Sequence, residues 1–120
     1  MEPIFDKQGR TVGWLVDDTI RDLSGRPVAF IAWDSLFDYS NQLLGRASDG
    51  FFRDLWGNAV GFLNHHSFGP LTPLTALPPL PPLPSIAPIH PIPPIPPLAP
   101  LPTLSWSPWS WEQLIHRERR

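Results

Sequence analysis

The first part of the chain repeats one pattern of apolar and polar positions four times. Blocks of 16 residues begin at Ile4, Ile20, Leu36 and Phe52. Each block opens with a short apolar segment, continues with a polar Asp-x-x-Gly or Asp-x-x-Asn turn, and then alternates as a half-buried strand does. A second polar junction closes the block. The pattern predicts an all-β fold of four consecutive β-hairpins in a pseudo-four-fold arrangement, with about eight short strands.

The turn positions explain why Asp and Gly recur at the same step. Asp at the first position of a type I turn accepts a backbone N–H two residues on, and Gly or Asn at the fourth position adopts the left-handed conformation. The column of Asp residues is therefore interpreted as turn-forming and not as a carboxylate or metal site. The predicted turn residues are Asp6, Gly9, Asp22, Gly25, Asp38, Asn41, Asp54 and Gly57.

Alternation along the second strand of each block assigns side chains to two faces, because residues two apart share a face. We expect Val12 and Trp14 to share a face in the core, together with the matching residues of the other blocks. The predicted repeat core is Val12, Trp14, Val28, Phe30, Leu44, Val60 and Phe62. A column of small residues lies on the other face, where another element can approach closely. Its members are Gly13, Ala29, Gly45 and Gly61.

The third block departs from the pattern. Asn41 replaces the turn Gly, Arg46 stands where the other blocks have Trp or Phe, and Ala47 stands where they have Leu or Ile. We expect this block to face something different from the other three. A two-fold character also appears within the repeat, as the alternation of Phe5, Arg21, Phe37 and Arg53.

These motifs resemble those of the 4-fold beta flower proteins, in which four hairpin repeats carry Asp-x-x-Gly-Arg and Val-Gly-Phe-type segments and a Pro-rich tail follows. The resemblance covers about residues 3–66 and extends into the tail. It implies the fold but transfers no catalytic or binding residue, because no biochemical function is established for the family.

A Pro-rich tail, residues 67–105, follows the hairpin domain of residues 1–66. Leu or Ile recurs at every third position of this tail from Leu71 onward. Polyproline II has three residues per turn, so this period places the Leu and Ile side chains on one stripe. A long uncharged apolar stripe is expected to be buried, either on the chain's own hairpins or on those of a neighbour. The predicted interface residues are Leu80, Leu83, Ile86, Ile89, Ile92, Ile95, Leu98, Leu101 and Leu104.

Residues 106–120 are expected to anchor the tail. Trp106, Trp109 and Trp111 supply large apolar surfaces with a polar edge. Ser110 and Gln113 have the spacing of a capping box, which predicts a short C-terminal helix. The basic residues of this segment are His116, Arg117, Arg119 and Arg120.

Composition narrows the classes of function. The 120 residues contain no Cys, and the formal net charge is −2. This charge offers no basic field for nucleic acid, frequent Pro disfavours a membrane-spanning helix, and the first residues lack the features of a signal peptide. We expect a cytoplasmic protein without a cofactor and without nucleic-acid or membrane partners. Its small core calls for support from the tail or from self-association.

The sequence therefore favours a non-catalytic structural or interaction module. Its apolar tail would join copies into a homo-oligomer or bind an unidentified protein partner. One alternative is a small ligand- or peptide-binding β module that uses Trp33 and Trp56. Another is a small metal-dependent hydrolase built on Asp54, His65 and His66. No phosphate loop, Gly-x-Ser-x-Gly or His-Glu-x-x-His motif occurs.

Overall fold

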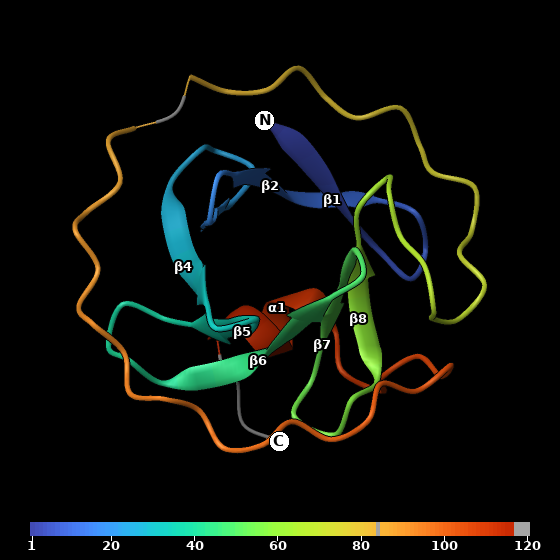
Figure 1. Cartoon of the computed structure of the whole chain (residues 1–120). Helices are drawn as coiled ribbons and strands as arrows, with labels where there is room; N and C mark the ends of the chain where they lie inside the picture. Colours follow the sequence, from blue (N-terminus) through green and yellow to red (C-terminus); the bar gives the residue numbers. More distant parts are fainter. Residues whose placement is uncertain (84, 117–120) are drawn as a thin grey trace.

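A computed structural model describes residues 1–83 and 85–116 and shows a closed antiparallel barrel inside a ring made by the tail (Figure 1). The strands pair in chain order, and β1 also pairs with β8. A helix, α1 (Trp111–His116), follows the tail. The structure confirms the all-β fold of four hairpins in a four-fold arrangement. The strands are β1 (Glu2–Asp6), β2 (Thr11–Val16), β3 (Thr19–Arg21), β4 (Pro27–Ala32), β5 (Ser35–Phe37), β6 (Leu43–Ser48), β7 (Phe51–Arg53) and β8 (Ala59–Phe62).

The Asp-x-x-Gly segments form the turns within the four hairpins. In the first turn, the backbone N–H groups of Gln8 and Arg10 donate to Asp6 Oδ1 at 2.9 and 3.0 Å, and the N–H of Gly9 donates to Asp6 O at 2.9 Å. The same bonds recur in the other three blocks. The fourth turn residue has a positive φ in every block, from 63° at Asn41 to 91° at Gly25 and Gly57. All eight predicted turn residues therefore lie in these turns.

The column of small residues lies on the inner face of the barrel, opposite large apolar side chains. Ile4 pairs with Gly13, and the same pairing recurs in each hairpin. A Cβ atom added to Gly45 would lie 3.4 Å from Leu114 Cδ1, and one added to Gly61 would lie 3.1 Å from the Trp111 ring. The missing bulk thus leaves room for α1.

The prediction that Val12 and Trp14 share a face is wrong. The β1–β2 register shifts between Ile4 and Phe5, which face Gly13 and Thr11, so Val12 is the extra residue of a β-bulge. The bulge turns Val12 into the interior cluster around α1, while Trp14 lies on the outer wall. The shift recurs in each hairpin. Val28, Leu44 and Val60 consequently join the interior cluster, whereas Phe30 and Phe62 do not.

The tail ring, residues 71–83 and 85–106, runs once around the barrel (Figure 1). A polyproline II chain of this length, at about 3.1 Å per residue, is about 110 Å long and closes a circle about 36 Å across. The molecule measures 37 × 35 × 27 Å along its principal axes. The indole Nε1 of Trp106 donates to Leu71 O at 3.3 Å, so the last residue of the ring meets the first.

The tail ring contacts the four hairpin turns at a regular spacing along its own sequence. Each hairpin turn contacts the tail ring at a point nine residues further along the tail than the previous turn, while the turns themselves are 16 residues apart. The backbone N–H of Ala76 donates to Gly9 O at 2.9 Å, and that of Thr103 donates to Gly57 O at 3.1 Å. The four contacts are Gly9 with Leu74, Gly25 with Leu83, Asn41 with Ile92 and Gly57 with Leu101.

After the ring, the chain runs beside β8 and ends in α1. Ala59 exchanges backbone hydrogen bonds with Ser105 and Ser107 at 3.0 and 2.7 Å. The capping box is formed, because Gln113 N donates to Ser110 Oγ and Ser110 N donates to Gln113 Oε1. Trp111, Leu114 and Ile115 are buried in the interior cluster. The short helix therefore closes one end of the barrel.

Candidate functional site

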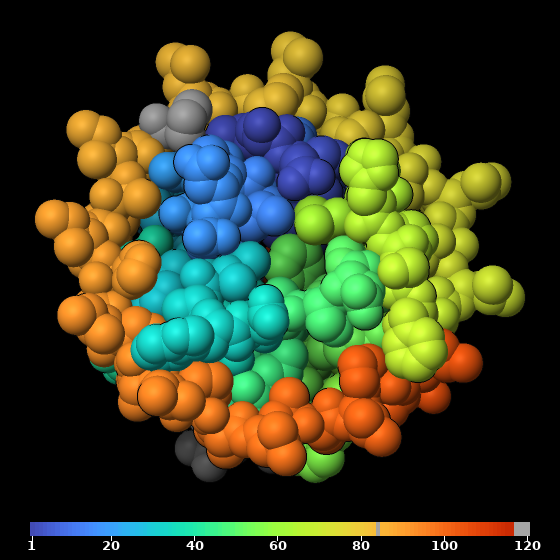
Figure 2. Space-filling view, viewed as in Figure 1, coloured from blue at the N-terminus to red at the C-terminus, as the bar shows by residue number. Residues whose placement is uncertain are grey.

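The outward stripe is the most unusual surface of the molecule. It comprises the Leu and Ile side chains at every third position from Leu71 to Leu104, and their exposed fractions run from 64% at Leu104 to 99% at Ile89 and Leu98. In Figure 2 these side chains project from the rim of the tail ring. Of the two alternatives predicted for the stripe, burial on the chain's own hairpins is wrong, and burial on a neighbour stays a prediction.

The tail contacts the barrel through the residues between the stripe positions. Pro93 is buried, and Pro78, Pro96 and Pro102 are partly buried. The imidazole of His90 stacks on the Phe30 ring with centroids 4.0 Å apart and planes 8° apart. Compact Pro rings allow the tail backbone to approach the turns closely enough for hydrogen bonding. With three residues per turn, one face of the tail then points outward along the whole ring.

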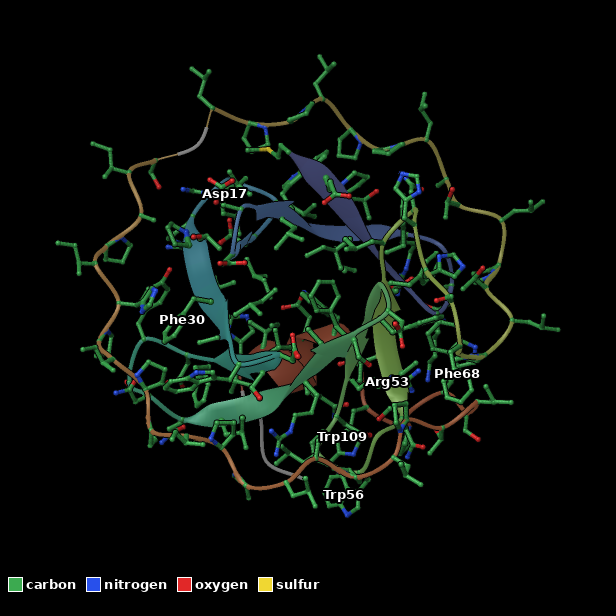
Figure 3. The ribbon with its side chains drawn as sticks, viewed as in Figure 1. Asp17, Phe30, Arg53, Trp56, Phe68 and Trp109 are labelled. Carbon is green, nitrogen blue, oxygen red and sulfur yellow. The ribbon has the colours of Figure 1, made fainter. Side chains whose placement is uncertain are left out.

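The three Trp residues that follow the Pro-rich tail hold the end of the ring to the barrel. Trp106 packs on Phe51 and Phe62, with centroid distances of 6.3 and 6.0 Å. Trp111 packs edge-on against Phe52 at 5.5 Å, and Trp109 stacks on Trp56 at 6.4 Å, as Figure 3 shows for the latter pair. The predicted basic residues Arg117, Arg119 and Arg120 lie outside the described residues.

The end of the barrel opposite α1 carries a shallow apolar mouth. A cavity of about 240 Å³ is lined there by one residue from each hairpin, namely Leu15, Ile31, Ala47 and Leu63. Asp34 and Asp49, in the turns between hairpins, border it. Figure 2 views the molecule from this end and shows the hollow between the turns. The mouth can accept a small apolar group beside acidic side chains.

Blocks three and four together place a pair of buried arginines on the outer wall. Arg46 and Arg53 are partners across β6 and β7, with exposed fractions of 8% and 1%. At the same outer positions, the other strand pairs place Trp14 beside Arg21, Phe30 beside Phe37 and Phe62 beside Phe5. Among these four outer pairs of the described barrel, the β6–β7 pair is thus the one in which both residues are cationic.

The arginine pair donates mainly to carbonyl groups. Arg46 Nη1 donates to Ser35 Oγ and Nη2 to Pro97 O, each at 2.9 Å. Arg53 Nη1 donates to Gly57 O and Thr103 O at 2.6 and 2.8 Å, and Nη2 donates to Phe68 O at 2.8 Å. Figure 3 shows Arg53 between the barrel and the tail. These bonds tie the outer wall to the tail backbone.

Burial shifts the pKa of both arginines in the same direction. Burial lowers the pKa of Arg46. Burial also lowers the pKa of Arg53, although the charges of Asp49 and Asp54 act in the opposite direction. Sequence reasoning singled out Arg46 as a departure from the repeat. It missed the pair, although the alternation of Phe5, Arg21, Phe37 and Arg53 supplied the second half of the signal.

The residues of the two alternative hypotheses do not gather in one place. Trp33 and Trp56 are 53% and 59% exposed, but Trp33 lies in the β4–β5 turn and Trp56 in the β7–β8 turn, at opposite ends of the barrel. The ring of His66 packs on Phe51 and Phe62. Among residues 1–83 and 85–116, no three His, Cys, Asp or Glu residues are placed to hold a metal ion.

A closed eight-stranded barrel of four equivalent hairpins, with a tail that returns to close it, defines a small all-β repeat protein. The family model described as 4-fold beta flower protein matches residues 2–115, and the chain belongs to this family. No catalytic function is known for the family. No curated protein and no solved structure shows a significant match to the chain. In the part of the chain that the structure describes, no helix is long and apolar enough to cross a membrane.

Proposed function

We propose that this protein is a non-catalytic structural module that self-associates through the outward stripe of its tail ring. The observation that carries the proposal is the exposure of the whole stripe, at 64% or more for each side chain. Soluble monomers rarely expose a contiguous apolar surface of this extent, and such surfaces mark interaction sites. The occupant is a second copy of the chain, because residues 67–111 carry no Asp, Glu, Lys or Arg that would repel an identical ring.

The shape of the ring sets the size of one contact. The stripe has twelve side chains from Leu71 to Leu104, so one side chain faces outward about every 30° of the circle. Two convex rings that touch side by side then engage about three stripe residues each. Full burial of a Leu or Ile contributes roughly 1.5–3 kcal/mol, and a tangential contact buries them only in part. With these six side chains about half buried, one contact contributes roughly 5–9 kcal/mol.

Association costs on the order of 4–15 kcal/mol, so a single ring-to-ring contact is weak. Several contacts per ring compensate for this, because each ring offers the same stripe in every direction in its plane. The expected product is an assembly larger than a dimer, with mass that grows steeply with protein concentration. A protein that encloses the ring is the competing occupant of the stripe.

The test compares the full chain with a variant in which one stripe residue per quarter of the ring is made polar, by the substitutions Leu77→Gln, Ile86→Gln, Ile95→Gln and Leu104→Gln. Every arc of three stripe residues then contains one Gln. Analytical ultracentrifugation over a hundredfold range of concentration measures the mass. We expect wild type to form higher oligomers and the variant to stay monomeric. At a dilution where wild type is also monomeric, the two melting temperatures should be nearly equal, because these side chains are exposed within the monomer.

A matched control carries four Gln substitutions at exposed tail prolines outside the stripe, namely Pro79, Pro88, Pro91 and Pro94. The control should assemble as wild type does. Wild type that remains monomeric at every concentration would refute the proposal. Loss of assembly in the control and the stripe variant alike would show that tail conformation matters and the stripe does not.

A further inference from the structure

We infer that the apolar mouth of the barrel is a binding site for a small organic ammonium ion, which inserts its apolar end between the hairpins and leaves its ammonium group at the acidic rim. The cavity at the mouth has a volume of about 240 Å³. It lies at one end of the barrel, whereas the outward stripe projects from the surrounding ring (Figure 2). The site is separate from the stripe and goes beyond the function proposed above.

The cavity exists because one member of a repeated layer is small. The layer takes one partly buried residue from the same position of each block, namely Leu15, Ile31, Ala47 and Leu63. Ala47 lacks the branched side chain that the other three carry. The unbroken run from Ala47 to Phe52 lines the cavity, so the hollow lies where that side chain is missing. The departure of block three at this position thus creates space for an apolar group.

The rim around this apolar floor is acidic. Asp34 and Asp49 line the cavity and are exposed. The three turns between hairpins contain no Lys or Arg, and their acidic residues are Asp17, Asp18, Asp34 and Asp49. Within the described residues, none of these four carboxylates forms an ion pair. A cation at the rim would therefore meet carboxylates that are not already paired.

The arginines of the outer wall offset only part of this charge. The charge of Asp49 acts on Arg53 through space. Arg46 and Arg53 together carry two positive charges against the four carboxylates of the turns, which leaves an excess of two negative charges. The Nη atoms of both arginines donate to oxygen atoms of the chain. Charge complementarity therefore favours a cation at the mouth and disfavours an anion.

The order of apolar and acidic surface selects the kind of cation. The floor is partly buried, and the carboxylates lie in exposed turns. An alkylammonium ion matches this order, because its apolar end enters first and its charge stays hydrated at the rim. The side chain of Lys has the reverse order, because its ammonium group is at the tip and would be carried toward the floor. A volume of about 240 Å³ lies below the range of about 300–1,000 Å³ for drug-sized ligands, so the apolar end is short.

The test titrates the full chain at neutral pH with n-butylammonium chloride, n-butanol and sodium pentanoate, which share one apolar chain and differ in charge. Isothermal titration calorimetry should show saturable binding of one butylammonium per chain, with butanol and pentanoate at least fivefold weaker. Affinity should rise about two- to fourfold with each methylene from ethylammonium to butylammonium. Absence of saturable butylammonium binding would overturn the inference. Equal binding of butanol would overturn the role of the charge, and tighter binding of N-acetyl-lysine amide would overturn the choice of a free ligand.

Two variants separate the apolar hollow from its acidic rim. Ala47→Leu supplies the residue that stands at Leu15 and Leu63, so it fills the hollow and should weaken butylammonium binding at least tenfold. The double variant Asp34→Asn, Asp49→Asn keeps the hollow and should bind butylammonium no more tightly than butanol. It tests the site even where Ala47→Leu does not fold.

The matched control for the charge is Glu112→Gln, which removes an exposed carboxylate from α1 at the other end of the barrel. This control should bind butylammonium as wild type does. Unchanged binding by Ala47→Leu, or an unchanged preference for butylammonium in the double variant, would contradict the site.

Discussion

The contact between the hairpin turns and the tail ring can be measured by comparing two glycines. Gly25 and Gly57 occupy equivalent turn positions and share a φ of 91°. A Cβ atom added to Gly25 would lie 3.1 Å from Pro82 Cγ and 3.2 Å from Leu83 O, which small shifts relieve. One added to Gly57 would lie 2.6 Å from Leu101 O, so the tail backbone itself must move.

The expected costs follow from these distances. Replacing Gly by Ala at this φ costs about 1–2 kcal/mol in either turn. In Gly57→Ala, displacement of the ring also breaks the hydrogen bond from Thr103 N to Gly57 O and weakens that from Arg53 Nη1 to Thr103 O. These bonds contribute about 0.5–1.5 and 1.5–3 kcal/mol. We expect a loss in unfolding free energy of about 1–2 kcal/mol for Gly25→Ala and about 3–6 kcal/mol for Gly57→Ala.

Urea denaturation followed by Trp fluorescence measures both losses against wild type. Because the backbone strain is the same at the two positions, the difference between the variants isolates the contact with the tail. Equal losses, within about 0.5 kcal/mol, would refute the conclusion that the ring is held against the Gly57 turn.

Three further changes test other parts of the structure. Trp111→Ala should lower the unfolding free energy by about 3–5 kcal/mol, because it opens a cavity where α1 closes the barrel; a loss below 1 kcal/mol in urea denaturation would contradict this placement. Ser110→Ala removes the helix cap and should cost about 0.5–2 kcal/mol in the same assay, and no measurable loss would argue against the capping box. Burial raises the pKa of Asp22, but hydrogen bonds from Ser24 and Arg26 outweigh burial and hold it below 3.8. This stabilisation is complete well above 3.8 and is lost as the pH falls through 3.8 and then through the lower pKa of the folded state, so the stability difference between wild type and Asp22→Asn should shrink from about pH 5 to pH 2. A constant difference over this range would contradict the turn bonds.

The hairpins could be predicted from the sequence because their determinants are local. Asp6 and Gly9 fix a turn through bonds within four residues, and the same spacing recurs three times. The face of Val12 could not be predicted in the same way. Its bulge depends on how β1 and β2 align, and one extra residue reverses the alternation beyond it.

Whether the tail stripe faces the barrel or the outside also could not be predicted from the sequence. A period of three shows that Leu80 and Leu83 share a face, but it does not say which way that face points. Hydrophobicity favours burial of Leu and Ile. In the structure, the tail side chains that pack against the barrel include Pro93 and His90 instead. The nine-residue spacing of the contacts between tail and turns could not be recognised, because the Leu and Ile residues already repeat every three residues. Thr103, whose backbone N–H donates to Gly57 O, interrupts the run of Pro at one of these contacts.

Half of the arginine pair could be predicted from the sequence. Arg46 stood out because it breaks a column of aromatic residues. Its proximity to Arg53 follows from the β6–β7 register, and the space beside it follows from Ala99, which lies 53 residues away along the chain. Long-range alignment of this kind cannot be derived from local pattern alone.

The agreement between a 16-residue barrel unit and a nine-residue ring unit limits how this protein can change in length. Adding a fifth hairpin would lengthen the wall, and the present tail would then be too short to meet its own beginning at Leu71. Three added tail residues would keep the stripe outward but would move each later bonding residue away from its turn. A viable change in the number of hairpins therefore requires a tail change of nine residues per hairpin, so the two halves of the gene must gain or lose units together.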